Sequence, residues 1–310
     1  MGQFIARRLL WLIPTILVMS LITFILMHAT PGSPLQPLAA NANPLPPEAQ
    51  KNLAHFYGLD KPLWQQYVIF VWKAVHLNFG YSYIYRTRLV TEILGSAMPV
   101  SLELGGMAML LAIVIGVPLG VLAAVNQNGP IDYLSTFLAT LGVAVPNFVL
   151  SIFFIVLFVI VLHILPSTGG WNGPKDWVMP AFALGLGPLG ILARYTRSSM
   201  VEVLQQDYVR TAQAKGLSHS RVVIGHAVKN GLIPPLTIVG PMFAAIGTGS
   251  FFVETIFRVP GMGRYFVDSI TARDYPMIMA VILIYGVFLA FMNLAVDVFY
   301  GVVDPRIRLS

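Results

Sequence analysis

Long runs of apolar residues constrain the fold of this chain more than any other feature. A helix needs roughly 20 apolar residues to cross the hydrocarbon core of a membrane, and the chain of 310 residues is 56% apolar and 10% charged. Such a composition excludes an ordinary soluble domain. Six segments are long enough to span: about Leu9 to His28, Val100 to Val125, Tyr133 to Leu162, Val178 to Ala193, Leu232 to Val253, and Pro276 to Tyr300. The sequence predicts an all-α polytopic membrane protein with six transmembrane helices, the fourth short and interrupted by LGLGPLG.

The distribution of lysine and arginine orients these spans. With both termini inside, the cytoplasmic segments hold ten basic residues and the external segments nine, but five of the nine lie in the first external loop. That loop exceeds the roughly 60 residues over which the positive-inside rule applies. The remaining ten against four predict cytoplasmic termini, and topology rather than nucleic-acid binding explains the net charge of +6. The predicted parts are the N-terminus with the first span (1–30), an external loop (31–99), a core of five spans (100–300) and a cytoplasmic tail (301–310).

The external loop has its own helical signals. PPEAQKNLAHFYGLD predicts a short helix with Pro47 near its first turn and Gly58 at its end. The next stretch, DKPLWQQYVIFVWKAVHLNFG, is too short to span and is rich in aromatic residues. It either lies flat on the membrane surface or packs against neighbouring external helices. Its apolar face consists of Trp64, Tyr67, Val68, Val71, Trp72 and Val75.

Reactive chemistry inside the spans is sparse. Ionisable residues lie near span ends, which argues against a proton- or sodium-coupled carrier. Pro146-Asn147 alone places a polar side chain near mid-span, where the asparagine either lines a pathway or makes an interhelical hydrogen bond. The sequence has no cysteine, no H-E-x-x-H or G-x-S-x-G motif, and no G-x-x-x-x-G-K-[ST] phosphate loop. We therefore expect no enzyme activity, metal site or cofactor in this chain, and a nucleotide that drives transport must bind another chain.

The longest cytoplasmic segment, residues 194–231, predicts a basic helical hairpin. Gly216 stands where a helix commonly ends in a left-handed residue, and Ser218 can cap the next helix. The first helix has an apolar stripe at i, i+4 spacing: Leu204, Tyr208 and Ala212. The second has an apolar side: Val222, Val223 and Ala227. Contact with anionic lipid explains these features weakly, whereas a docking element for a cytoplasmic partner explains the length, the turn and the small residues.

This hairpin resembles the cytoplasmic loop of ABC-importer permeases, commonly written E-A-A-x-x-x-G. The matching positions are Arg210-Thr211-Ala212 and Gly216, so an arginine replaces the glutamate. DYVRTAQAKGLSHSRVVIGHAVKN is similar to the version in the dipeptide, oligopeptide and nickel branch. Further stretches resemble the B-type permease subunit of that branch, in order along nearly the whole chain: PGSPL, YGLDKPLWQQYVIFVWKAVHLNFGYS, ETIFRVPGMGRYFVDSITARDYPM and NLAVDVFYGVVDPRIR.

The resemblance implies a type I ABC-importer permease fold within a heteromeric complex of the bacterial inner membrane. The implied partners are a C-type permease subunit, two ATPase subunits that bind ATP and Mg²⁺, an external substrate-binding protein and membrane lipid. The first helix of the hairpin is then a coupling helix that rests in a groove of an ATPase. The residues carried over to this role are Tyr208, Arg210, Thr211, Ala212, Ala214, Lys215, Gly216 and Leu217. Because Arg210 replaces the glutamate, the residues that make polar contacts with the ATPase stay open.

The leading hypothesis is ATP-driven uptake of short peptides that the substrate-binding protein delivers. Related permeases import nickel chelates, glutathione or oligosaccharides, and this alternative stays open. A self-sufficient ion-driven carrier and a membrane scaffold without transport are the other hypotheses. Candidate pathway residues are Pro146, Asn147, Gly240, Ala244 and Thr248. Candidate residues of an external gate or receptor-docking surface, with plain packing as the alternative, are Glu254, Gly261, Gly263 and Arg264.

Overall fold

The computed structural model describes residues 2–32, 34–35, 46–85, 87–166 and 170–303. Within these ranges the chain forms helices and connecting loops, and the β-structure is an isolated bridge between Tyr81 and Leu89. Most of the predicted proline-rich start of the external loop and most of the predicted tail, with Arg306 and Arg308, lie outside the described residues.

Four helical runs among the described residues are each long and apolar enough to cross a membrane, and two bent pairs bring the total to as many as six. The single runs are α1 (Gly2–Ala29), the continuous α4 (Val90–Leu111), η1 (Ala112–Gly116) and α5 (Val117–Val125), then α8 (Pro174–Leu204) and α15 (Tyr275–Val303). In the first bent pair, α6 (Pro130–Ala144) is followed by the helix formed by α7 (Asn147–Phe154) and η2 (Ile155–Val161). In the second, the helix formed by α10 (His219–Val222), η3 (Val223–Ala227) and α11 (Val228–Gly231) is followed by α12 (Ile233–Gly247). The predicted all-α polytopic fold is confirmed.

The fourth span is longer and more regular than the sequence predicts. α8 is one uninterrupted helix of 31 residues, and LGLGPLG lies inside it. The glycines there do not end the helix, because they are positions of close contact. A Cβ added at Gly185 would lie 2.8 Å from the carbonyl oxygen of Ala108 in α4, and one at Gly190 would strike the carbonyl oxygen of Ala139 in α6. The expected interruption was wrong because the same residues that weaken an isolated helix allow neighbouring backbones to approach it.

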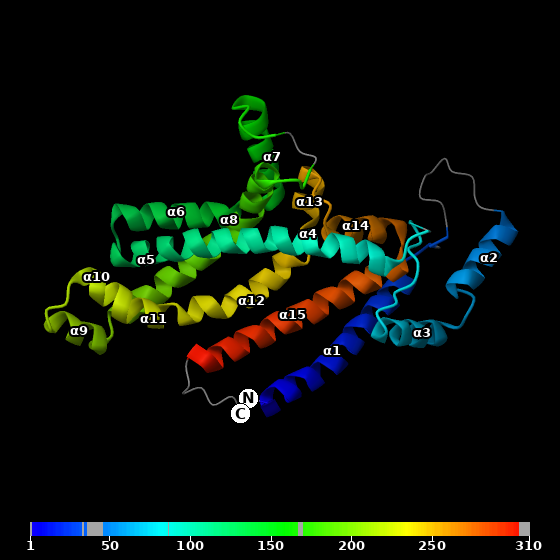
Figure 1. The fold of residues 1–310 in the computed structure, drawn as a ribbon, viewed down its shortest axis with the longest axis horizontal. Helices are drawn as coiled ribbons and strands as arrows, with labels where there is room; N and C mark the ends of the chain where they lie inside the picture. The colour runs from blue at the N-terminus through cyan, green and yellow to red at the C-terminus, as the bar shows by residue number, and fades with distance from the viewer. Residues whose placement is uncertain (1, 33, 36–45, 86, 167–169, 304–310) are drawn as a thin grey trace.

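The third span is broken rather than continuous. α6 and the α7–η2 helix meet at an angle of 102° at Val145 and Pro146, so α7 leaves the direction of α6 (Figure 1) while it still packs against α8. Proline has no N–H to donate and disfavours helical backbone in the residue before it. Val145 accordingly has extended backbone. The proline therefore ends one helix and begins the next.

The predicted fifth span also divides. α12 ends at Gly247, Gly249 has φ +113°, and the chain continues into α13 (Phe251–Phe257) and α14 (Met262–Ala272). A residue with such a positive φ lies in a region that glycine adopts without steric cost. The chain thus turns before Val253, where the sequence predicts the span to end.

The long helices form a bundle around α8, with α4–α5, α6 and α12 packed against it. α1 and α15 run side by side along one flank, and α2 and α3 lie at the end of the bundle opposite α9, α10 and α11 (Figure 1). α2 (Pro47–Tyr57) ends at Gly58 with φ 72°, as predicted.

The apolar face predicted for α3 (Leu63–Val75) divides between two environments. Tyr67 turns toward α1, where its hydroxyl lies 2.9 Å from Ser20 Oγ. Trp64 and Trp72 are more than half exposed. The helix therefore packs against α1, a candidate spanning helix, on one side and offers an apolar stripe on the other.

The close packing of α8 generates a prediction. Gly185→Ala is expected to lower the free energy of unfolding by about 1–3 kcal/mol, because the added methyl group overlaps a backbone carbonyl that cannot rotate away. Gly187→Ala is the matched control on the same helix, since its Cβ would have ordinary contact at 3.6 Å with the carbonyl oxygen of Gly142. Thermal unfolding in detergent micelles compares the two. Equal unfolding temperatures would contradict this account of α8.

Candidate functional site

A helix–glycine–helix hairpin projects from the end of α8. The chain turns at Gln205 and Gln206, forms α9 (Asp207–Ala214), and returns through the α10–η3–α11 helix (His219–Gly231). Gly216 lies between the two arms with φ +80°, and its N–H donates to the carbonyl oxygen of Gln213 at 2.9 Å. The predicted helical hairpin is therefore present. Ser218 occupies the N-cap position of the second arm, although its side chain makes no capping hydrogen bond.

The hairpin has a small core of its own. Val209, Ala212 and Val222 are buried, and Leu204 and Leu217 pack against them. The predicted stripe is thus wrong at Tyr208, which is 41% exposed. Leu204 ends α8 and the turn at 205–206 changes the helical register, so i, i+4 spacing counted from Leu204 does not continue into α9. The apolar face of α9 instead follows Val209 and Ala212.

The remaining surface of α9 is polar and open. Of the eight residues predicted to couple to an ATPase, Ala212 is buried and Leu217 is half-buried. Arg210 forms an ion pair with Asp207 at 3.6 Å, but both side chains are at least 70% exposed. Such a pair contributes roughly 0.2–1 kcal/mol, so the arginine can readily take another partner. The exposed members of the predicted set are Tyr208, Arg210, Thr211, Ala214, Lys215 and Gly216.

The second arm fixes the hairpin to the helix bundle. Met200 of α8 is fully buried in a cluster with Ala124 of α5 and with Val223 and Ala227 of the arm. Gly231 lies so close to Met200 that an added Cβ would overlap its sulfur. In addition, Asn230 Nδ2 donates to the Tyr208 hydroxyl at 2.8 Å, which joins the two arms across the turn. The hairpin is therefore a compact unit attached to the ends of α5 and α8.

An ion pair that the sequence did not reveal joins α6 to α8 near the same end. Arg197 donates to both carboxylate oxygens of Asp132, through Nε to Oδ1 and through Nη2 to Oδ2 at 2.6 Å. The backbone N–H of Asn128 also donates to Asp132 Oδ2 at 2.9 Å. Asp132 is 4% exposed and Arg197 30%. A bidentate pair of this geometry sets the orientation of the two helices, and only the fold brings its members together, 65 residues apart.

The candidate gate residues meet at the opposite end, around a buried carboxylate. Glu254 is fully buried and accepts hydrogen bonds from the Ser101 hydroxyl at 2.8 Å and from the backbone N–H of Gly263 at 2.8 Å. The Ser101 oxygen in turn accepts from the N–H of Met262 at 2.7 Å. A Cβ at Gly261 would overlap Ser101 and Glu254. This Glu254 cluster, defined by Glu254, Ser101, Met262, Gly261 and Gly263, ties the loop before α14 to α4.

Arg264, the fourth candidate of this group, has an exposed side chain, although its backbone contributes to the hydrogen bonding of Glu254. Its guanidinium lies 3.7 Å from Asp268 in an ion pair in which both side chains are about half exposed. It is therefore a surface residue, whereas the other three are interior.

A second buried carboxylate, Asp274, was not singled out from the sequence. It accepts from the Ser82 hydroxyl and from the N–H groups of Ile84 and Met277, the latter two at 3.3 Å. Burial raises the pKa of Asp274, as it does for Glu254. Within the described part of the chain, neither belongs to a group of three or more His, Asp or Glu side chains able to hold a metal ion. Both serve as acceptors that fix the loops at this end of the molecule to the helix bundle.

The candidate pathway residues fall into two places. Pro146 and Asn147 lie at the break between α6 and α7. Gly240 packs against α15, since a Cβ there would lie 3.0 Å from the carbonyl oxygen of Met292. Ala244 is fully buried, and Thr248, also buried, donates to its carbonyl oxygen at 3.0 Å. The ridge Gly240, Ala244 and Thr248 thus faces the interior of this subunit.

Known protein families match this chain in two consecutive parts. Residues 116–309 match the family described as "Binding-protein-dependent transport system inner membrane component", and residues 1–105 match its N-terminal counterpart. The dipeptide transport system permease protein DppB of Bacillus subtilis is 44% identical over 309 residues, covering 100% of this chain and 99% of the relative. The oligopeptide transport system permease protein OppB of Escherichia coli is 41% identical over 310 residues, covering 99% and 100%.

Solved structures share the fold at low sequence identity. The MetNI methionine ABC transporter, in inward-facing conformations, gives a TM-score of 0.57 at 14% identity, covering 68% of this chain and 96% of that one. An amino acid ABC transporter gives a TM-score of 0.52 at 16% identity, with coverages of 67% and 93%. The helical arrangement is therefore that of ABC-transporter membrane subunits.

The buried position of Glu254 predicts a pH dependence. Burial raises the pKa of Glu254, although its hydrogen bonds act in the opposite direction. In the unfolded chain the pKa of a glutamate is about 4.3. There is therefore a pH interval in which Glu254 is protonated in the folded chain and ionised in the unfolded chain. The stability contributed is fully present below that unfolded value and is lost as pH rises through the folded pKa. The unfolding temperature of the wild type, compared with that of Glu254→Gln, should therefore fall as pH rises above about 4.

Thermal unfolding across pH checks this sign. Glu48→Gln, which removes a carboxyl group from an exposed position in α2, is the matched control. A wild-type advantage over Glu254→Gln that grew with pH would show that hydrogen bonds to the carboxylate outweigh its burial.

Proposed function

Since the chain belongs to the family of binding-protein-dependent transport inner-membrane components, as a B-type dipeptide/oligopeptide permease subunit, we propose that it forms half of the pathway of an ATP-driven importer of short peptides. The observation that carries the proposal is the hairpin. It exposes the polar face of α9 and is fixed through Met200 to the bundle. A surface segment that is rigid and coupled to spanning helices is what a permease needs to receive work from a separate ATPase.

The proposed complex contains this chain, a homologous C-type permease, two ATPases and an external substrate-binding protein. The ATPases bind ATP and Mg²⁺, because no phosphate loop is present in this sequence. The distribution of basic residues supports cytoplasmic termini. That orientation puts the hairpin beside the ATPases and puts α2, α3 and the Glu254 cluster on the side of the substrate-binding protein.

Force on α9 has a direct route into the spanning helices. The core of Val209, Ala212 and Val222 makes the two arms move together. The second arm presses on Met200 and Ala124, so displacement of the hairpin displaces the ends of α8 and α5. The exposed Arg210, Lys215 and Tyr208 are then free to contact the ATPase, whereas Ala212 and Leu217 maintain the shape of the hairpin.

The continuous helix α4–η1–α5 extends this route to the external face. Ala124, near one end, contacts the hairpin arm, and Ser101, toward the other, donates to Glu254. These residues are 23 positions apart, about 35 Å along a helix. The Glu254 cluster is thus linked to the hairpin through one helix, and we propose that its loop opens or closes the external mouth.

The relatives named above support peptides as the substrate class. Nickel chelates, glutathione and oligosaccharides are alternatives within the same machinery. Purification of the intact complex, followed by mass spectrometry of the ligand that co-purifies with the substrate-binding protein, distinguishes them. A co-purified metal chelate or sugar in place of a peptide would replace the substrate assignment while leaving the permease role intact.

The coupling role of the hairpin predicts the behaviour of Gly216→Val. A β-branched residue at φ +80° incurs about 1–2 kcal/mol of backbone strain, which the turn relieves by changing the angle between the arms. We expect peptide uptake per ATP hydrolysed to fall about fivefold or more in proteoliposomes.

Gly225→Ala is the matched control for this variant. Gly225 lies in the second arm, and a Cβ there would meet no atom within 4 Å, so the ratio of uptake to hydrolysis should stay at the wild-type value. A normal ratio in Gly216→Val would remove the basis for assigning α9 as the coupling helix.

The energy source gives a separate prediction. Uptake by proteoliposomes that contain the whole complex should require ATP on the hairpin side and should persist when an uncoupler collapses the ion gradients. Uptake that the uncoupler abolishes and that ATP depletion leaves unchanged would instead establish the ion-driven carrier. Substrate-independent ATPase activity without uptake, in every combination of partners, would establish the scaffold.

A further inference from the structure

A pocket of about 630 Å³ lies at the end of the bundle opposite the hairpin. It is enclosed by α2, α3, the adjoining ends of α1 and α15, and the loop between α3 and α4. Aromatic rings form much of its wall: Phe24, Phe56, Tyr57, Tyr81, Tyr83 and Tyr275. Nothing in the proposed transport mechanism uses this space.

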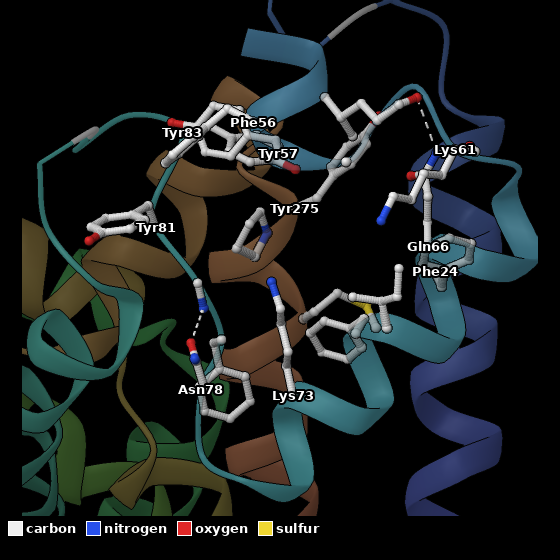
Figure 2. Close-up of a pocket in the computed structure, with 18 of the residues that line it drawn as sticks. Phe24, Phe56, Tyr57, Lys61, Gln66, Lys73, Asn78, Tyr81, Tyr83 and Tyr275 are labelled. Atoms are coloured by element: carbon white, nitrogen blue, oxygen red, sulfur yellow. Dashed lines mark hydrogen bonds between the residues drawn. The ribbon is translucent and has the colours of Figure 1, made fainter. Parts of the chain in front are cut away.

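The charged groups in this pocket have one sign. Lys61 and Lys73 line it, and no Asp or Glu is present among its described lining residues. Figure 2 shows the side chain of Lys73 reaching from α3 into the pocket, below the rings of Phe56, Tyr57 and Tyr83. Asp60, the neighbour of Lys61, is already bonded to His55 at 2.8 Å. The pocket is therefore suited to an anionic group.

His28 forms part of the wall of the same pocket. Its Nδ1 donates to the carbonyl oxygen of Phe24 at 2.9 Å. Its Nε2 is enclosed by protein atoms, so the ring shapes the pocket and offers no polar contact through this nitrogen.

A second cavity of about 660 Å³ adjoins the first. It is a groove between α1, α3, α4 and α15 whose lining is apolar apart from the hydroxyls of Ser20 and Thr91. Phe70 and Phe79 line both cavities, so one wall separates the cationic pocket from the apolar groove. Because α1, α4 and α15 belong to membrane-spanning runs, the groove opens where acyl chains are the solvent.

We propose that the two cavities together hold one anionic phospholipid. The phosphate lies between Lys61 and Lys73, and an acyl chain occupies the groove beyond Phe70 and Phe79. An anionic headgroup joined to a hydrocarbon chain matches both halves of the site, whereas a soluble anion matches the pocket alone. Such a lipid fills the space between α1 and the rest of the bundle.

Reconstitution in mixed bilayers of dioleoylphosphatidylglycerol and dioleoylphosphatidylcholine tests the headgroup. After extraction of the full chain in mild detergent, lipid mass spectrometry measures the ratio of the two lipids retained per protein. Wild type should retain phosphatidylglycerol preferentially. Lys61→Gln with Lys73→Gln should lower the ratio about fivefold per lysine. Lys51→Gln, an exposed lysine of α2 outside the pocket, is the control and should leave the ratio unchanged.

A glycine in the groove tests the acyl chain. Gly95 lines the groove, and a Cβ there would meet no atom within 4 Å, so Gly95→Leu adds a side chain at an unobstructed position of the groove wall. It should lower retention of both lipids. Gly106→Leu is the matched control on the same helix, because Gly106 is equally unobstructed and lies outside the groove.

Three results would overturn the proposal. The first is a wild-type lipid ratio in the lysine variant, and the second is undiminished retention in Gly95→Leu. The third is a combination of two observations: inorganic phosphate displaces the retained phosphatidylglycerol, and Gly95→Leu leaves lipid retention unchanged. That combination would assign the pocket to a soluble anion. If the lysine variant raised the KM for peptide uptake with retained lipid unchanged, the pocket would belong to the peptide instead.

Discussion

The close approach of neighbouring backbones to α8 is the contact on which the rest of the structure depends. Apolar side chains gain little by leaving lipid for one another, so spanning helices associate through tight packing between small residues. At Gly185 and Gly190 of α8, no side chain separates the helix from the carbonyl groups of α4 and α6. The most apolar window of α8 is 61% buried, against 11% for α1. α8 is therefore the centre of the bundle, and α1 lies at its edge.

Because α8 holds the bundle together, the features at its two ends belong to one mechanical unit. Met200 and Arg197, near one end, receive the hairpin arm and α6. The packing of α4–α5 along α8 carries the connection onward to Ser101 and Glu254. Packed cores transmit displacement rather than absorb it. Changes of direction then fall on the breaks in the helices, at Pro146, at Leu232 and around Gly249.

Features encoded by adjacent residues were predictable, and features that depend on distant partners were not. The hairpin follows from Gly216 and from short-range apolar spacing, and the end of α2 follows from Gly58. Ser101 and Glu254, by contrast, are 153 residues apart, and Ser82 and Asp274 are 192 apart. No local pattern marks a carboxylate that will be buried. The sequence singled out Glu254, but it did not single out the Ser101 partner of Glu254 or the second buried carboxylate, Asp274.

Glycine and proline show why local rules were insufficient within the spans. In LGLGPLG they were expected to interrupt a helix, yet α8 passes through them because α4 and α6 need the space. At Pro146 the outcome is the reverse, since the sequence predicts one span from Tyr133 to Leu162 and the helix breaks there by 102°. An isolated proline or glycine only weakens a helix. Whether the helix continues depends on what packs against it, and a single sequence does not contain that information.

The flank formed by α1, α2 and α3 is assembled by a different kind of contact. From Gln3 to Ala29, α1 contains no glycine, and where α1 meets Gly286 of α15 the side chain of Met19 fills the contact, so side chains rather than backbones separate α1 from its neighbours. Rings fill much of the resulting gap: Phe24 with Tyr67 at 5.4 Å, Tyr57 with Tyr83 at 4.4 Å and His28 with Tyr275 at 5.0 Å between centroids. Flat, rigid rings cannot fill an irregular volume completely, and both large cavities lie on this flank. The core excludes lipid because its backbones touch, whereas the flank leaves room that the membrane itself can fill.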